Sequence, residues 1–257
     1  MQSLKKPLII LIAITFLIAV VASLTMLFSV KKVYAKFSVY GDSQAEEIQK
    51  ELDAFNGKNL VFLKLSDVME VCGKFPYYEI TSVKKEYPNV IKLTVEKRAE
   101  VFKIENADKA YVLDKDGIIL NDNGETEYPR NVLSVDIGDL SVVSGAVGTK
   151  IKTSDDELFY SVLMSSQALK LNDSVKSVEI SDNGHGWRDA IFKTYTGVVI
   201  NIWDVDDDGE AKIRKAFSYY ETISDYKKTS GIIKTYKVSN PESIDDGKII
   251  AEWPSGN

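Results

Sequence analysis

The sequence predicts an α+β protein that carries an N-terminal transmembrane helix followed by two domains. Three observations indicate this: an uncharged apolar run at residues 8–30, a change from helical to strand periodicity within residues 57–98, and short strand patterns mixed with two helical stretches beyond them. We expect a tail at 1–7, the helix at 8–30, a first domain at 33–101 and a second, mainly antiparallel β domain with two helices at 102–254.

The apolar run from Leu8 to Val30 has the length of a membrane span. Its 23 residues would extend roughly 34 Å as a helix, against a hydrocarbon core of about 30 Å. A cleavable signal peptide is the alternative, with residues 33–35 as the cleavage site. Apolar cores of signal peptides usually run about 7–15 residues, and here Lys31 and Lys32 separate the run from that site. The pattern favours an uncleaved anchor.

The distribution of charged residues does not decide the orientation of the apolar helix in the membrane, but it limits the kinds of partner that the body can bind. Lysines flank both ends of the run, so the positive-inside rule does not decide which end is cytoplasmic. The first thirty residues hold two lysines and no acid, and the remaining 227 hold 30 basic and 38 acidic side chains, a formal charge of −8. This body disfavours nucleic acid and anionic lipid headgroups as partners. The single cysteine, Cys72, excludes an internal disulfide framework.

The first domain is predicted to begin with a strand at 36–40, where apolar and polar residues alternate. Ser43 and Glu46 have the spacing of a capping box, which predicts the start of a helix. The expected buried face of this helix consists of Ile48, Leu52 and Phe55. Gly57 suits the left-handed conformation that follows a helix end.

A second helix and a hairpin follow in the same domain. Ser66 is the expected N-cap and Pro76 the stop. The expected buried face consists of Leu65, Val68, Met69, Cys72 and Phe75. The period then falls to two at 78–81 and 91–96, with the turn at Pro88–Asn89. The predicted order of this domain is strand, helix, helix, strand, strand.

The order of these features resembles the POTRA module of the bacterial cell-division proteins FtsQ and DivIB. The residues that carry the resemblance are Gly57, Asn59, Leu60, Phe75, Pro76, Val83, Lys84, Lys85, Pro88, Asn89, Val95, Glu96 and Arg98. Tyr77 departs from the pattern, because the family usually has Trp there. The resemblance implies a cytoplasmic N-terminus and an extracytoplasmic body.

The second domain is predicted to be mostly sheet. A hairpin joins 111–113 to 118–120 through 114–117, a pattern that also resembles FtsQ and DivIB, and Ser154 with Glu157 forms another capping box. Further strands are expected at 132–137, 175–180, 190–194, 198–203, 232–238 and 248–253, and helices at 154–171 and 210–226.

Candidate catalytic and metal-binding residues are few. His185 lies between glycines, which favours a solvated turn over a general base. Cys72 is expected to be a small buried hydrophobe. Residues 204–209 match the first half of a calcium loop, but Lys215 stands where the bidentate Glu belongs, and a strand-to-helix turn with Asp208 as N-cap explains the same residues. We expect no catalytic residue, no metal and no cofactor.

The last strand, 248–253, is expected to border its sheet and to offer backbone groups to a partner strand. The alternative is an edge that only closes the fold, guarded by Lys248 and Glu252. The resemblance implies that FtsB or DivIC binds here together with FtsL. The implied contact residues are Tyr236, Lys237, Val238, Lys248, Ile249, Ile250, Ala251, Glu252 and Trp253, beside the 210–226 helix.

These inferences predict a non-catalytic, single-pass division protein that binds FtsB/DivIC-like and FtsL-like proteins and so regulates septal peptidoglycan synthesis. The alternative is a membrane-anchored extracytoplasmic sensor or a calcium-dependent ligand-binding module that would use residues 204–209. A POTRA-bearing outer-membrane assembly factor fits less well, since no long series of amphipathic barrel strands follows.

Overall fold

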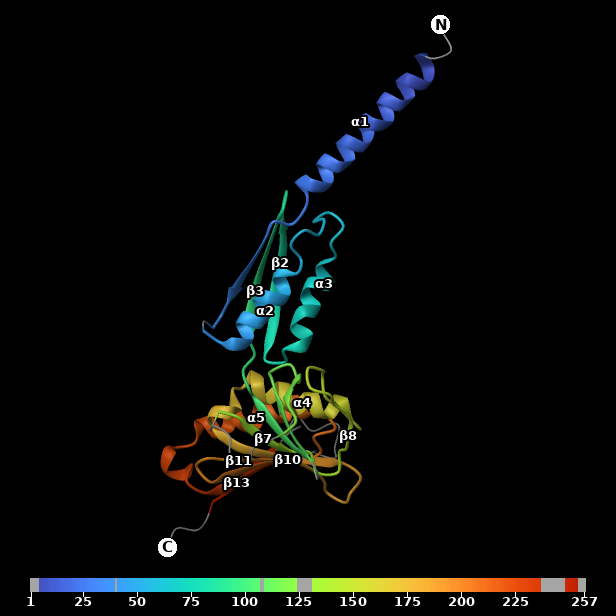
Figure 1. Ribbon diagram of the computed structural model, residues 1–257. Helices are drawn as coiled ribbons and strands as arrows, with labels where there is room; N and C mark the ends of the chain where they lie inside the picture. Colours follow the sequence, from blue (N-terminus) through green and yellow to red (C-terminus); the bar gives the residue numbers. More distant parts are fainter. Residues whose placement is uncertain (1–4, 40, 107–108, 124–130, 237–247, 254–257) are drawn as a thin grey trace. The chain divides into compact units, whose positions relative to one another are not determined.

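The computed structural model describes residues 5–39, 41–106, 109–123, 131–236 and 248–253 (Figure 1). It confirms the predicted α+β class, with an apolar N-terminal helix and a largely β body. The chain divides into two compact units, Met1–Arg98 and Ala99–Asn257.

Helix α1 (Lys5–Leu27) is long and apolar enough, over Ile9–Leu27, to cross a membrane by length and composition. The hydroxyls of Thr15, Ser23 and Thr25 are satisfied within the helix, because they donate to carbonyls one turn earlier. The helix ends three residues before the predicted boundary at Val30. Residues 28–30 leave it because their backbone bonds to the loop at 57–60 of the first unit.

The first unit contains a three-stranded sheet in the order β1 (Lys32–Phe37), β3 (Val90–Lys97), β2 (Tyr78–Glu86). β1 runs parallel to β3, and β2 runs antiparallel to it. Helix α2 (Ser43–Asp53) and helix α3 (Leu65–Met69), which continues as the 3-10 helix η1 (Glu70–Lys74), cover one face of this sheet (Figure 1). The order of strand, helix, helix, strand, strand is the predicted one.

Several predicted boundaries in this unit are wrong. The first strand occupies Lys32–Phe37 instead of 36–40, because pairing with β3 starts directly after the apolar helix. Asp42, not Ser43, caps α2, since its carboxylate accepts a hydrogen bond from the backbone of Gln44. Ser66 lies inside α3, whose N-cap position is Lys64 without a side-chain cap.

The core of the first unit lies between the two helices and the sheet. Its buried residues are Val30, Val33, Ala45, Ile48, Leu52, Phe55, Leu60, Leu63, Val68, Val71, Cys72, Phe75, Tyr78, Ile80, Ile91, Leu93 and Val95. Met69, predicted to be buried, is half exposed because the helix tightens to 3-10 geometry after it. Burial raises the pKa of the Cys72 thiol to about 11, so this cysteine is an unreactive core residue. The 3-10 helix ends two residues before Pro76, which cannot continue it.

The second unit is built on a nine-stranded sheet with the order β14-β13-β12-β11-β10-β7-β4-β5-β6. Its strands are β4 (Phe102–Asn106), β5 (Lys109–Leu113), β6 (Ile119–Asn121), β7 (Leu133–Asp136), β10 (Val175–Asp182), β11 (Arg188–Thr194), β12 (Val198–Ile202), β13 (Gly231–Tyr236) and β14 (Lys248–Glu252). Two short strands, β8 (Val142–Ser144) and β9 (Lys152–Thr153), pair separately. Five of the eight neighbouring pairs in the large sheet are antiparallel.

Helices α4 (Asp156–Ala168) and α5 (Gly209–Thr222) lie side by side on one face of this sheet (Figure 1). Each lies in a crossover between parallel strands, α4 between β7 and β10 and α5 between β12 and β13, since parallel neighbours require a long connection. Two short 3-10 helices, η2 (Leu171–Asp173) and η3 (Asp225–Lys227), complete the connections.

The predicted caps of these helices also need correction. Asp155, and not Ser154, caps α4 through a hydrogen bond from the backbone of Leu158. Asp208 precedes α5 as predicted, but it adopts a left-handed backbone conformation and its side chain makes no cap hydrogen bond. The helices bury Phe159, Val162, Ile213 and Phe217 against the sheet, where Phe217 meets Phe192 edge-on at 5.2 Å.

Candidate partner-binding surface

Strand β14 lies at one end of the nine-stranded sheet, as the sequence predicts. It pairs antiparallel with β13, and Ile233 faces Ala251 while Thr235 faces Ile249. Among the described residues no strand pairs with its other side. Every second backbone N–H and C=O of β14 therefore points away from the sheet, in the direction from which an added strand would pair.

The two faces of β14 differ in their packing. Ile249, Ala251 and Trp253 pack against the core of the second unit. Ile250 turns to the opposite face and is 36% exposed, beside Ile232 at 37% on β13. An added strand could thus contact partly buried apolar side chains on one face and the accessible Ile250 on the other.

Trp253 fixes the end of β14 on β13. Its ring lies directly over the backbone of Gly231, where a Cβ atom would come within 2.2 Å of the ring carbon Cε3. Gly231 has a φ of 137°, a region that side-chain-bearing residues rarely adopt. The glycine allows both the backbone conformation and the close approach of the indole.

One charged pair crosses the exposed face of this strand pair. The Nζ atom of Lys234 lies 3.2 Å from Oε1 of Glu252, and Lys234 is the less exposed partner. The charge of Glu252 is thus balanced from within the sheet, which weakens its action as a charged guard of the edge.

The structure brings together most of the residues predicted for this surface. Residues 248–252 form β14, Trp253 follows it, and Tyr236 ends β13 opposite Lys248. Lys237 and Val238 lie outside the described residues. Helix α5, the third predicted component, packs over β12 and β13 with its buried face toward the sheet.

The residues of the POTRA-like pattern hold the turns of the first unit. Gly57 has a φ of 85°, as predicted, and its N–H donates to the carbonyl of Val30 at 2.8 Å. The side chain of Asn59 accepts a hydrogen bond from the backbone of Val61 at 2.9 Å. Pro88–Asn89 lies in the turn between β2 and β3.

The remaining members of this pattern join β2 to the end of β3. Arg98 pairs with Glu79 at 3.0 Å, and the Thr81 hydroxyl donates to Glu96 at 3.3 Å. Val83 packs against the core of the unit. These contacts give the pattern a structural role.

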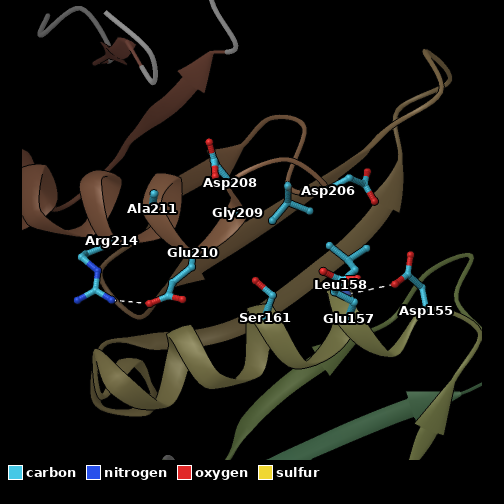
Figure 2. Close-up of a pocket in the computed structure, with 11 residues that line it drawn as sticks. Asp155, Glu157, Leu158, Ser161, Asp206, Asp208, Gly209, Glu210, Ala211 and Arg214 are labelled. Atoms are coloured by element: carbon cyan, nitrogen blue, oxygen red, sulfur yellow. Dashed lines mark hydrogen bonds and ion pairs between the residues drawn. The ribbon is translucent and has the colours of Figure 1, made fainter. Parts of the chain in front are cut away.

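A cavity of about 610 Å³ opens between the first turns of α4 and α5 (Figure 2). Acidic residues dominate its wall: Asp155, Glu157, Asp206, Asp208 and Glu210. Arg214 reaches back along α5 to pair with Glu210. Because these acids lie at the N-termini of two helices, they interact favourably with the positive ends of the helix dipoles.

Arg188, whose role was not predicted from the sequence, pairs with several of the acidic side chains in this region. Its guanidinium contacts Asp139 and Asp155 at 3.1 Å each and Asp206 at 3.2 Å, while its backbone N–H donates to Asp206 at 2.6 Å. Burial alone would lower the pKa of Arg188, but the hydrogen bond and charge of Asp139, with the charges of Asp206 and Asp155, raise it. These acids are far apart in the chain, so no spacing signals the cluster.

This geometry explains the calcium-like residues 204–209 without a metal. Arg188 engages the carboxylate of Asp206, and the buried ammonium of Lys212 donates to the carbonyl of Asp204 at 2.7 Å. Positive side chains thus occupy positions near oxygens that a calcium loop would direct at its ion. Within the part of the chain that the structure describes, no group of three or more His, Cys, Asp or Glu side chains is arranged to hold a metal ion.

His185 lies in an exposed turn between β10 and β11. Its backbone N–H donates to the side chain of Asn183, and its ring lies 5.7 Å from that of Trp187. This is the solvated turn that the flanking glycines predict.

No protein-family model matches this chain. It is 27% identical over 130 residues to the cell division protein DivIB of Clostridium acetobutylicum, a match that covers 49% of this chain and 45% of that relative. This similarity supports the resemblance to the FtsQ/DivIB family that the sequence motifs suggested. The matched segment spans less than half of the relative, so the relative's name carries a cell-division role in general terms and no particular partner.

Proposed function

We propose that this chain is a non-catalytic, single-pass division protein whose second unit binds another division protein by strand addition at β14. The similarity to DivIB supports the division role. The observation that carries the binding mode is the position of β14 at the end of the nine-stranded sheet, with the side chain of its own Ile250 accessible.

The proposed partners are an FtsB/DivIC-like protein, paired with β14, and an FtsL-like protein bound with it. Together they would regulate septal peptidoglycan synthesis. The first unit would act as a POTRA module, for which its strand, helix, helix, strand, strand order and its turn residues are the support. α1 would hold both units outside the cytoplasmic membrane and so raise their effective concentration near other anchored partners.

Localisation in dividing cells tests the division role. A fluorescent fusion to the full chain is expected to gather at the septum as constriction begins. An even distribution around the membrane, from a fusion that remains full length, would contradict the division role whatever the chain binds.

Affinity capture from membrane extracts tests the partners. The detergent-solubilised full chain is expected to retain the FtsB/DivIC-like and FtsL-like proteins of the same cell. An Ile250→Lys variant should lose them, while Ile232→Lys, an equally accessible position on the inner strand β13, should retain them. Equal retention by both variants would move the binding surface away from β14.

A further inference from the structure

Exposed apolar side chains gather in the loops at one end of the first unit. Phe62 is 82% exposed and Val61 44%, both in the loop between α2 and α3, and Tyr87 is 60% exposed in the turn between β2 and β3. Single exposed apolar residues are common and need no explanation. These loops are joined, because Lys85 at the end of β2 donates to the carbonyl of Val61 at 3.3 Å.

Hydrogen bonds attach these loops to the residues directly after α1. The N–H of Leu60 donates to the carbonyl of Phe28 at 2.7 Å, and the N–H of Lys31 donates to that of Asn89 at 2.9 Å. The rings of Phe28 and Tyr87 meet edge-on, 6.0 Å apart. Consecutive Cα atoms are about 3.8 Å apart, so a membrane span that ends at Leu27 places Phe28 and the loops bonded to it at the membrane interface.

The charge of this region differs from that of the whole body. Residues 31–98 hold 12 basic and 10 acidic side chains, so the excess of acid lies entirely in residues 99–257. Lys31 and Lys58 are exposed in the bonded segments, and the ammonium of Lys58 lies 4.3 Å from the centre of the Phe55 ring. Lysines with apolar stems and aromatic neighbours are typical of membrane interfaces. The net negative charge of the body therefore does not exclude lipid contact here.

We propose that Phe28, Val61, Phe62 and Tyr87 form an interfacial tip that enters the phospholipid headgroup layer around the chain's own membrane span, with lysines beside lipid phosphates. The aromatic side chains enter the interface because it accepts their apolar bodies and keeps polar groups hydrated. This inference rests on the proposed membrane span and is independent of the division role. It gives the first unit a second attachment to the membrane in addition to the span formed by α1.

Lipid-borne quenching tests the tip in the full chain. A Phe62→Cys variant in a Cys72→Ala background carries an environment-sensitive fluorophore and is reconstituted into vesicles of phosphatidylcholine and phosphatidylglycerol. Gln44→Cys, exposed at the start of α2, carries the same fluorophore as the matched control. We expect a lipid spin-labelled near its headgroup to quench the label at position 62 about twofold or more strongly than the label at 44, with a blue-shifted emission at 62 only.

Equal, weak quenching at positions 62 and 44 would contradict entry of the interfacial tip into the headgroup layer. Alkaline carbonate extraction of the same vesicles then shows whether the tip alone or the membrane span itself is absent. Chain that stays in the membrane with an unquenched label at 62 contradicts the tip alone and leaves the span and the division role standing. Chain that is released contradicts the span, and the tip with it. Matching thermal transitions of the labelled and unlabelled chains, measured before reconstitution, exclude misfolding at position 62.

Discussion

The two larger sheets of the described residues end in edge strands of different chemistry. β1, an edge of the first sheet, alternates exposed Lys32, Tyr34 and Lys36 with apolar residues. β14, an edge of the second, begins with one lysine, Lys248, and then carries Ile249, Ile250 and Ala251 in succession, and its one acid, Glu252, is paired with Lys234. Lysines on an edge strand discourage pairing with other chains. This difference supports β14, rather than β1, as the edge for the proposed strand addition.

A large effect is expected from proline at two successive positions of β14, Ile250→Pro and Ala251→Pro. Successive residues of a strand direct their N–H groups to opposite sides. The variant that loses the N–H facing β13 should lower the free energy of unfolding by about 2–3 kcal/mol. The other should fold normally and bind the FtsB/DivIC-like partner about tenfold more weakly or worse. Thermal unfolding and titration of the detergent-solubilised chain measure both, and normal partner affinity in both variants would break the comparison.

Gly231→Ala tests how β14 is held on its neighbour. A Cβ at this position collides with Trp253, and the φ of 137° disfavours alanine, so we expect a loss of stability of about 3 kcal/mol and a red shift of Trp253 emission. Gly186→Ala is the control, because a Cβ there has no atom within 4 Å although φ is 91°. It should show the backbone cost alone, about 1–2 kcal/mol. Similar losses for both variants would mean that Trp253 does not anchor the edge.

Ile250→Lys places an exposed lysine within the edge strand β14, as β1 has at Lys32 and Lys36. Affinity for the partner should fall about tenfold, because a lysine ammonium must lose water when a strand is added beside it. Stability should change by less than about 0.5 kcal/mol, since the position is accessible. Isothermal titration with the purified partner distinguishes this from the Ile232→Lys control, for which the affinity should stay within about twofold.

Thr235→Val probes the strand behind the edge. The Thr235 hydroxyl is buried and has no hydrogen-bond partner among the described residues, so its replacement by a methyl group should raise stability by about 0.5–1 kcal/mol. Thr194→Val is the opposite case, because that hydroxyl bonds both the N–H and the carbonyl of Val198. It should cost about 1–3 kcal/mol. Chemical unfolding of the two variants should therefore give changes of opposite sign.

In the first unit, the pH dependence of stability should reveal the ion pair between Lys97 at the end of β3 and Asp42 at the start of α2. The hydrogen bond from Lys97 holds the pKa of Asp42 at about 2. The folded state thus binds this proton less readily than the unfolded chain, so the contribution is present above pH about 4 and is lost as the pH falls toward 2. Asp42→Asn keeps an acceptor for the helix cap, and its difference in stability from the wild type should shrink over that interval. A stability difference between Asp42→Asn and the wild type that stays constant over this pH interval would contradict a stabilising Asp42–Lys97 ion pair.

Sequence periodicity predicted the order of elements in the first unit and most of those in the second, because each amphipathic segment must bury one face, but it missed β4, β8 and β9. It failed at both capping boxes, where an aspartate next to the expected serine accepts the bond: Asp42 beside Ser43 and Asp155 beside Ser154. Both residue types suit the position, so local sequence cannot choose between them. The edge position of β14 was predicted from its place among the strands, and the family resemblance added only the expected partner.

Long-range pairing could not be predicted in the same way. β7 pairs in parallel with β10, and β12 with β13, although helices separate the two strands of each pair in the sequence. No residue pattern within these strands predicts which strand becomes the neighbour. The cluster around Arg188 depends on those pairings. Asp139, Asp155 and Asp206 meet it only after the sheet has assembled, so their sequence spacing carries no signal.

Amide hydrogen exchange at β14 tests the proposed strand addition most directly. The full chain, in detergent, is compared alone and in complex with the FtsB/DivIC-like partner, and exchange is resolved residue by residue over 248–252. Strand addition predicts that alternate amides of β14, those facing away from β13, become protected in the complex, while the amides already bonded to β13 change little. Unchanged exchange along β14, with protection elsewhere on the second unit, would contradict it.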